Sequence, residues 1–231
     1  MIEENIKFDV YKSIESDIVS LRLLPGEVIT EKELCERFNM SRTPIRSVLQ
    51  RLEENGFISI VPHKSTTVTT IKLDIVTQLI YQRIAVESMV LRDFIRNYNP
   101  TEIENVRYQA RLMEELAEKI LSSKDFDIQE FLERDHKMHE VWFNATDKAY
   151  LWKNITKPDP NYARLMRLDV LVANNIEDVI NEHRQLMDII DNRKFDRIEE
   201  CISLHLYGGV RRLGSRLFSD EYKRYFGESR S

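Results

Sequence analysis

The sequence predicts a mainly α-helical protein, with a winged helix-turn-helix first and an all-helical bundle after it. Apolar residues recur at helical spacing through most of the 231 residues. Strand-like alternation is confined to the segment before residue 71, and almost no glycine follows until Gly208. We therefore expect two domains, residues 1–71 and residues 75–231, joined by a short link without Gly or Pro.

The segment Ser41–Arg51 is predicted to be the second helix of the helix-turn-helix. Ser41 suits the N-cap, and Pro44 falls in the first turn, where its missing N–H leaves no hydrogen bond unmade. One face of this helix is apolar and is expected to be buried: Ile45, Val48, Leu49 and Leu52. The opposite face is polar and available to a partner: Thr43, Arg46, Ser47 and Gln50.

Flanking signals complete the motif. Thr30-x-x-Glu33 is a capping box that opens a short helix ending at Phe38, and Asn39-Met40 makes the turn between the two helices. Downstream, FISIV and TTVTTI surround residues 62–65, which indicates two strands and a hairpin, the wing. An earlier helix over residues 8–20 is expected to pack behind them.

Charge is informative only locally. The net charge is -5, and residues 1–70 hold 9 Lys and Arg against 11 Asp and Glu, which gives no general case for nucleic acid. Between residues 37 and 52, however, there are four arginines and no acid. This basic segment coincides with the proposed second helix, as expected of a DNA-reading element.

Cysteine usage and hydropathy predict the compartment. Cys35 and Cys201 lie far apart, each within an apolar helical pattern, which fits reduced thiols better than a disulfide. The charged N-terminus and the lack of a run of about 18 apolar residues predict neither a signal peptide nor a membrane span. We expect a cytoplasmic protein.

The order helix, L-x-P-G, E-K-E-L, S-R-T-P-I-R and wing resembles the GntR family of bacterial transcription regulators over residues 8–70. The resemblance implies DNA contacts by Lys32, Arg42 and Arg46. The full DNA-binding set that we expect is Lys32, Ser41, Arg42, Thr43, Arg46, His63 and Lys64. Two departures are the Arg46-Ser47-Val48-Leu49 run, where the family usually has R-E-A-L, and Ser65, where the wing usually has glycine.

The second domain is predicted to be a bundle of long helices. The first is expected to bury a stripe of apolar residues: Ile75, Leu79, Val86, Val90 and Phe94. Asn99-Pro100 opens a helix to about Leu121, and further helices are expected over about 127–144, 162–173, 176–191 and 196–218. Asp196-x-x-Glu199 is expected to cap the last one.

Four polar residues in this bundle have the spacing of a metal site. Asp135 and His139 are one helical turn apart, and His183 and His205 lie on apolar faces of two later helices. Imidazole and carboxylate suit a divalent ion, with Zn²⁺ expected and Ni²⁺, Mn²⁺ or Fe²⁺ as alternatives. The plainer interpretation is that each histidine is separately satisfied. His136 lies off this face, and His63 lies in the wing.

Residues 75–218 resemble the FCD ligand-binding domain of the FadR-type branch of the GntR family. There a D-x-x-x-H pair, an E-H and a later histidine bind metal, which implies the ligands Asp135, His139, His183 and His205. Arg83, in the first helix, needs an anion, either Glu87 or an effector carboxylate. Arg164 and Arg167 are weaker effector-binding candidates that are more simply explained as solvated.

The expected function is that of a metabolite-responsive transcription regulator, specifically a repressor, and not an enzyme. Its expected partners are a double-stranded DNA operator, a second copy of the chain in a homodimer, and a small carboxylate effector. One alternative is a metal-dependent hydrolase that uses the three-His, one-Asp cluster to activate water. Another is an interaction protein that uses the winged helix only as a scaffold.

Overall fold

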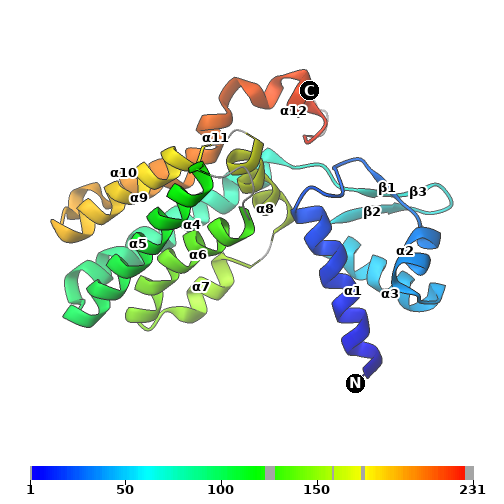
Figure 1. Cartoon of the computed structure of the whole chain (residues 1–231), viewed down its shortest axis with the longest axis horizontal. Coiled ribbons are helices and arrows are strands. Elements are labelled where there is room, and N and C mark those ends of the chain that lie inside the picture. The colour runs from blue at the N-terminus through cyan, green and yellow to red at the C-terminus, as the bar shows by residue number, and fades with distance from the viewer. Residues whose placement is uncertain (1, 123–127, 158, 173–174, 227–231) are drawn as a thin grey trace. The chain divides into compact units, whose positions relative to one another are not determined.

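The computed structural model describes residues 2–122, 128–157, 159–172 and 175–226 (Figure 1). The chain forms two compact units. Residues 1–76, 158–167 and 214–231 make up the first, the wing unit, and residues 77–157 and 168–213 make up the second, the bundle unit. The described part of the chain is mostly helical, as the sequence predicts.

The wing unit has the expected order of elements. It contains α1 (Ile2–Val19), β1 (Val28–Ile29), α2 (Glu31–Phe38), α3 (Arg42–Glu54), β2 (Ile58–Val61) and β3 (Ser65–Val68). The strands form an antiparallel sheet in the order β1-β3-β2, with Val28 opposite Thr67 and Ile58 opposite Val68. The two-residue β1 was not predicted, because two residues are too few to show alternation.

Local signals explain the helix-turn-helix. The Thr30–Glu33 capping box is present, and Asn39 ends α2 in the left-handed conformation with φ 49°. Ser41 occupies the N-cap position of α3, although its side chain makes no capping hydrogen bond. The predicted apolar face of α3 is buried in one core with α1 and the sheet: Ile45, Val48, Leu49 and Leu52.

Later segments return to the wing unit. They are α8 (Pro160–Arg167), the 3-10 turn Gly214–Phe218 and α12 (Asp220–Lys223). The backbone N–H of Ile71 donates to the carbonyl of Tyr225 at 2.8 Å. The expectation that Arg164 is solvated is wrong, since its side chain is fully buried and donates to the carbonyl oxygens of Pro160 and Thr69.

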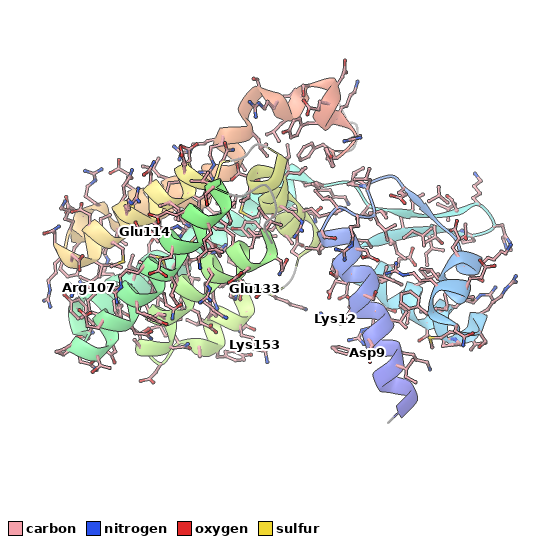
Figure 2. All side chains as sticks on the ribbon, in the orientation of Figure 1. Asp9, Lys12, Arg107, Glu114, Glu133 and Lys153 are labelled. Atoms are coloured by element: carbon pink, nitrogen blue, oxygen red, sulfur yellow. The ribbon has the colours of Figure 1, made fainter. Side chains whose placement is uncertain are left out.

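The bundle unit consists of helices whose side chains fill the space between them (Figure 2). It contains most of α4 (Leu73–Asn97), then α5 (Pro100–Ser122), α6 (Ile128–Ala145), α7 (Ala149–Ile155), the π-helix Leu168–Val172, α9 (Ile176–Asp191), the 3-10 turn Phe195–Arg197, α10 (Ile198–Leu206) and α11 (Gly208–Leu213). Among the described helices, none is long and apolar enough to cross a membrane.

The predicted buried stripe of α4 is partly wrong. Val90 and Phe94 are buried, but Ile75, Leu79 and Val86 are only half-buried. The inward row instead runs through Val76, Ile80, Arg83, Glu87 and Val90. The prediction missed it because a search for apolar residues passes over Arg83 and Glu87, whose opposite charges neutralise each other inside the unit.

The C-terminal helices also differ from the prediction. The expected helix over 196–218 is interrupted after Leu206 and again after Leu213, and Asp196 lies in a 3-10 turn, where it caps nothing. Gly208 and Gly209 explain the first interruption, because glycine is a poor helix former. The helix expected over 162–173 is split into α8 and the π-helix, and residue 173 lies outside the described residues.

Candidate functional site

The exposed face of α3 is the first candidate site. Arg42, Thr43 and Arg46 are exposed, as are Ser47 and Gln50. Nε of Arg46 donates to Oε1 of Glu31 at 2.7 Å, and this hydrogen bond lowers the pKa of the Glu31 carboxyl. The guanidinium is therefore held at the surface by a solvated ion pair, which is worth little and is easily exchanged for another anion.

Other predicted DNA-contacting residues surround this face within the wing unit. Lys32 is exposed on α2, 3.8 Å from Glu36. His63 and Lys64 are exposed in the turn between β2 and β3, and His63 takes the left-handed conformation with φ 60°. Ser65 begins β3 opposite Val61, so the turn closes without a glycine at that position.

The second candidate site lies inside the bundle unit. Asp135 and His139 on α6, His183 on α9 and His205 on α10 each offer a ligand atom, and these atoms lie within 4.8 Å of one another. Nε2 of His139 lies 3.1 Å from Nε2 of His205, and Nε2 of His183 lies 3.1 Å from Oδ1 of Asp135. The four residues predicted from spacing thus meet, and we call them the His/Asp cluster.

Burial sets the charge state of the cluster. His139 is fully buried, whereas the Asp135 side chain keeps 27% of its exposure. Burial lowers the pKa of His205 well below its usual value, and the neighbouring His183 and His139 lower it further. Burial alone would raise the pKa of Asp135, but the contact with His183 outweighs it and lowers that pKa. A neutral imidazole beside a carboxylate is the form that binds a metal.

A buried ion pair orients His139. Its Nδ1 lies 2.7 Å from Oε2 of Glu87, whose Oε1 accepts from Nε of Arg83 at 2.6 Å. Burial would raise the pKa of Glu87, but Arg83 and His139 more than offset this and lower it to about 2. Glu87 is therefore ionised, which favours the proton on Nδ1 of His139 and leaves its Nε2 as a bare acceptor.

A second carboxylate faces His205 in the same way. Nδ1 of His205 lies 3.2 Å from Oε2 of Glu182. Nη1 of Arg212 donates to Oε1 of Glu182 at 2.5 Å, and Nη2 of Arg212 donates to Oδ2 of Asp169 at 2.5 Å. We call His205–Glu182–Arg212–Asp169 the Arg212 relay. Here too, a proton on Nδ1 leaves Nε2 of His205 bare.

The polar atoms of the cluster fit a divalent cation. With both Nδ1 atoms directed at carboxylates, two nitrogen lone pairs face each other at 3.1 Å, which is unfavourable without a cation. Nδ1 of His183 is buried without a hydrogen-bond partner among the described residues, and its Nε2 faces the Asp135 carboxylate at 3.1 Å. Metal–ligand bonds of about 2.0–2.2 Å allow two ligand atoms of one ion to lie no more than about 4.4 Å apart. The ligand atoms of the cluster lie within 4.8 Å of one another, so they need to approach by only a few tenths of an ångström to bind one ion.

Comparison with known families decides the class of protein. Residues 7–68 match the bacterial regulatory proteins of the gntR family, and residues 78–208 match the FCD domain. The chain belongs to the GntR family of transcription regulators. Its members bind DNA and are not enzymes, so the hydrolase alternative is set aside.

Individual relatives agree with this GntR assignment. The HTH-type transcriptional repressor RspR of Escherichia coli K12 is 26% identical over 200 residues, covering 85% of this chain and 84% of RspR. The fold resembles E. coli McbR/YncC, with TM-score 0.65 and 17% identity over 91% of this chain and 98% of that one. It also resembles a GntR regulator from Rhodococcus sp. RHA1, with TM-score 0.63, 13% identity and coverage of 90% and 97%.

The three arginines considered as effector ligands in this GntR regulator have different surroundings. Arg83 is buried one helical turn from Glu87, so the simpler of its two predicted partners is present. Burial lowers the pKa of Arg164 to about 10, and its hydrogen bonds to backbone carbonyls lie within the wing unit. Arg167 is half-buried in the same unit. Of the three, only Arg83 belongs to the unit that holds the cluster.

Sequence analysis missed several residues around the GntR regulator's His/Asp cluster. Glu182 had a signal, since it directly precedes His183. Asp169 and Arg212 had none, because the π-helix and the glycine-broken α11 obscure the helical spacing that would have placed them inward. Trp142 and Trp152 have ring centroids 4.8 Å and 6.3 Å from that of His139, so the two tryptophans of the chain adjoin the cluster.

Proposed function

We propose that this GntR regulator is a metabolite-responsive repressor whose His/Asp cluster binds a divalent metal ion, Zn²⁺ in the first instance. The observation that carries the proposal is the 3.1 Å approach of two imidazole Nε2 atoms whose Nδ1 atoms both face carboxylates. The membership of residues 78–208 in the FCD domain supports it, because FCD domains bind metals. Ni²⁺, Mn²⁺ and Fe²⁺ suit the same donors.

The effector is proposed to be a small carboxylate. Three imidazoles and one carboxylate leave coordination positions open on an ion that accepts five or six ligands, and a carboxylate oxygen is a suitable donor for them. Arg83 contacts Glu87, which in turn contacts His139, and we assign its positive charge to the far end of the effector. Binding of the effector would then compete with Glu87 for this guanidinium.

DNA binding is assigned to residues 1–71, and effector binding and dimerisation to residues 75–231. The proposed DNA contacts are Lys32, Ser41, Arg42, Thr43, Arg46, His63 and Lys64. Repression is proposed because the relative RspR is described as a repressor. Exposed Arg42 and Arg46 on the polar face of α3 support reading of base edges or phosphates by that helix.

A homodimer on a roughly twofold operator completes the proposal. One recognition helix covers one half-site, and two related by symmetry supply both affinity and specificity. Tyr81 and Met89 are 73% and 70% exposed on α4, eight residues apart and therefore on the same side of the helix. Large apolar side chains exposed in a row on one helix are typical of a protein interface.

Metal content is the decisive measurement. Full-length protein purified without added metal would be dialysed against Zn²⁺ and analysed for bound elements. We expect one ion per chain in the wild type and less than a tenth of that in the Asp135→Ala, His139→Ala, His183→Ala triple variant. His136→Ala is the matched control, because His136 adjoins Asp135 in sequence but is exposed. Equal metal content in the triple variant and the wild type would refute the site.

A further inference from the structure

The Arg212 relay connects the His/Asp cluster to two distant segments of the chain. Arg212 lies on α11, Asp169 in the π-helix and Glu182 on α9. The guanidinium bonds Asp169 through two nitrogens, with Nε to Oδ2 at 3.1 Å and Nη2 to Oδ2 at 2.5 Å. Asp169 is 1% exposed and also accepts from Nδ2 of Asn175 at 2.7 Å. Both acids of the relay are thus held by one side chain.

The positions of Asp169 and Arg212 in the chain are significant. The chain passes from the wing unit into the bundle unit between Arg167 and Leu168, and back between Leu213 and Gly214. Asp169 is the second residue after the first of these crossings, and Arg212 is the second residue before the other. Their ion pair therefore ties two crossings together, from inside the bundle unit.

Gly208 keeps the relay closed. A Cβ at this position would lie 2.5 Å from Nη1 of Arg212 and 2.7 Å from Oε1 of Glu182. Both distances are shorter than real contacts, so any larger residue would push these side chains apart. The glycine thus permits the close approach of α11 to Glu182, in addition to interrupting the helix.

We propose that Arg212 is a positioning residue that couples metal occupancy of the His/Asp cluster to the two chain crossings next to Asp169 and Arg212. This inference rests on the metal site proposed above. An ion on Nε2 of His205 fixes the ring and directs its Nδ1–H at Glu182. Glu182 then keeps one oxygen for His205 and one for Arg212, which leaves the rest of the guanidinium on Asp169. Without the ion, the His205 ring no longer has a fixed orientation. The Glu182 carboxylate can then move with the ring and change its contact with Arg212.

The His139 side of the cluster is less suited to such coupling. Glu87 is fully buried, and its partner Arg83 lies one turn away on the same helix, so their contact is internal to α4. The His205 contact to Glu182 is longer, 3.2 Å against 2.7 Å, and its relay joins four separate elements, α10, α9, α11 and the π-helix. A change at His205 therefore reaches more of the backbone than a change at His139.

Amide hydrogen exchange on the full-length protein tests the coupling. Exchange would be compared with saturating Zn²⁺ and with a chelator, over peptides covering 168–172, 208–213 and the ligand helix α6. In the wild type we expect Zn²⁺ to slow exchange in all three by on the order of tenfold, which corresponds to about 1.4 kcal/mol. In Arg212→Met we expect slowing in α6 only, and a Zn²⁺ affinity lower by roughly 10–100-fold, as for other residues that orient metal ligands.

Two further variants keep the test decisive. Gly208→Ala retains every charged residue while displacing Glu182 from Arg212, so it should reproduce the Arg212→Met pattern even if that variant folds poorly. Arg184→Met is the control, because Arg184 lies on α9 near Glu182 but bonds the half-buried Glu114 on α5 at 2.7 Å. It should behave as the wild type does.

The outcomes separate this inference from the proposed function. If the wild type binds Zn²⁺ and both Arg212→Met and Gly208→Ala keep the full slowing at 168–172 and 208–213, the metal site stands and the coupling is overturned. The same holds if Zn²⁺ slows exchange only in α6 of the wild type. If the wild type binds no Zn²⁺, the metal proposal fails. There is then no bound ion whose effect the Arg212 relay could transmit.

Discussion

The Nε2 atoms of His139 and His205 lie 3.1 Å apart inside the bundle unit, although the two residues are 66 positions apart in the chain. Each ring has its other nitrogen on a carboxylate, Glu87 for His139 and Glu182 for His205. Hydrogen bonding to those carboxylates leaves the facing nitrogens without protons. A cation between them would relieve the repulsion, and the first prediction follows from this.

Ion binding should be visible in tryptophan fluorescence. Both tryptophans of the chain, Trp142 and Trp152, adjoin His139, so a paramagnetic ion such as Ni²⁺ in the cluster should quench most of the emission. Titration of the full-length protein with Ni²⁺ should give a saturable decrease with one ion per chain. His183→Ala should abolish this decrease, because the variant lacks a proposed ligand that lies beside Asp135. Both tryptophans still lie beside His139 in this variant, so the fluorescence remains able to report a bound ion. An undiminished response in His183→Ala would contradict the assignment of His183 as a ligand.

Arg46 should contribute to sequence-specific binding. It lies on the exposed face of α3, paired only with the surface carboxylate of Glu31 in the described part of the chain. If its guanidinium reads a base edge, Arg46→Ala should weaken operator binding by roughly 1–3 kcal/mol, with a smaller loss for nonspecific DNA. Competition binding at fixed salt measures both affinities. An unchanged ratio of specific to nonspecific affinity would exclude base readout.

Arg51→Ala is the matched control for that experiment. Arg51 lies on the same helix and is exposed, but its guanidinium carbon lies 4.9 Å from the centre of the Tyr11 ring, which directs it toward α1. Its loss should change specific and nonspecific binding by similar, smaller amounts.

Leu49→Asp should unfold the core of the wing unit. Leu49 is 2% exposed and packs in the cluster shared by α1, α3 and the sheet. Leu→Ala at such a position costs about 2–5 kcal/mol, and a carboxylate adds the cost of burying charge. Circular dichroism and limited proteolysis should show loss of the wing unit with a helical bundle retained. Gln50→Asp, at the exposed neighbour, should remain native, and a native Leu49→Asp protein would overturn the orientation of α3.

Cys201 should be the less reactive of the two thiols. Burial raises its pKa to about 11, whereas Cys35 is only half-buried. Iodoacetamide at pH 8.5 should therefore modify Cys35 first, as peptide mapping would reveal. Because the folded pKa is raised, the stabilising contribution of Cys201 is complete below about pH 9 and is lost as the pH rises through about 11. Preferential labelling of Cys201 would contradict its burial.

The elements that sequence analysis predicted well have signals confined to a few consecutive residues. The Thr30–Glu33 capping box and the apolar face of α3 each follow from helical spacing within one element, as does the Asp135–His139 pair of the His/Asp cluster. Helical spacing placed the four ligands on the inward faces of three helices, because each ligand lies among apolar neighbours. The meeting of those faces at one point required the resemblance to the FCD domain as well.

The remaining features depend on contacts between distant segments. Arg164 bonds the carbonyl of Thr69, 95 residues away, and no local pattern predicts that a charged residue will be buried by backbone acceptors. The two-residue β1 exists only because β3 pairs with it. The Arg212 relay likewise joins α10 and α9 to a π-helix and the short α11, and the last two lack the regular helical spacing that would have placed Asp169 and Arg212 inward.

The last prediction concerns the response to the effector. A ligand changes DNA affinity only if it binds two states of the protein unequally, and a tenfold change needs about 1.4 kcal/mol of differential affinity. We expect a small carboxylate to alter operator affinity of the Zn²⁺-loaded wild type by at least this factor, and to have no effect on His183→Ala, which should still bind DNA. His136→Ala should respond as the wild type does. DNA titrations with and without a panel of organic acids give the measurement, and a Zn²⁺-loaded protein that responds to none of them would leave the ion with a structural role.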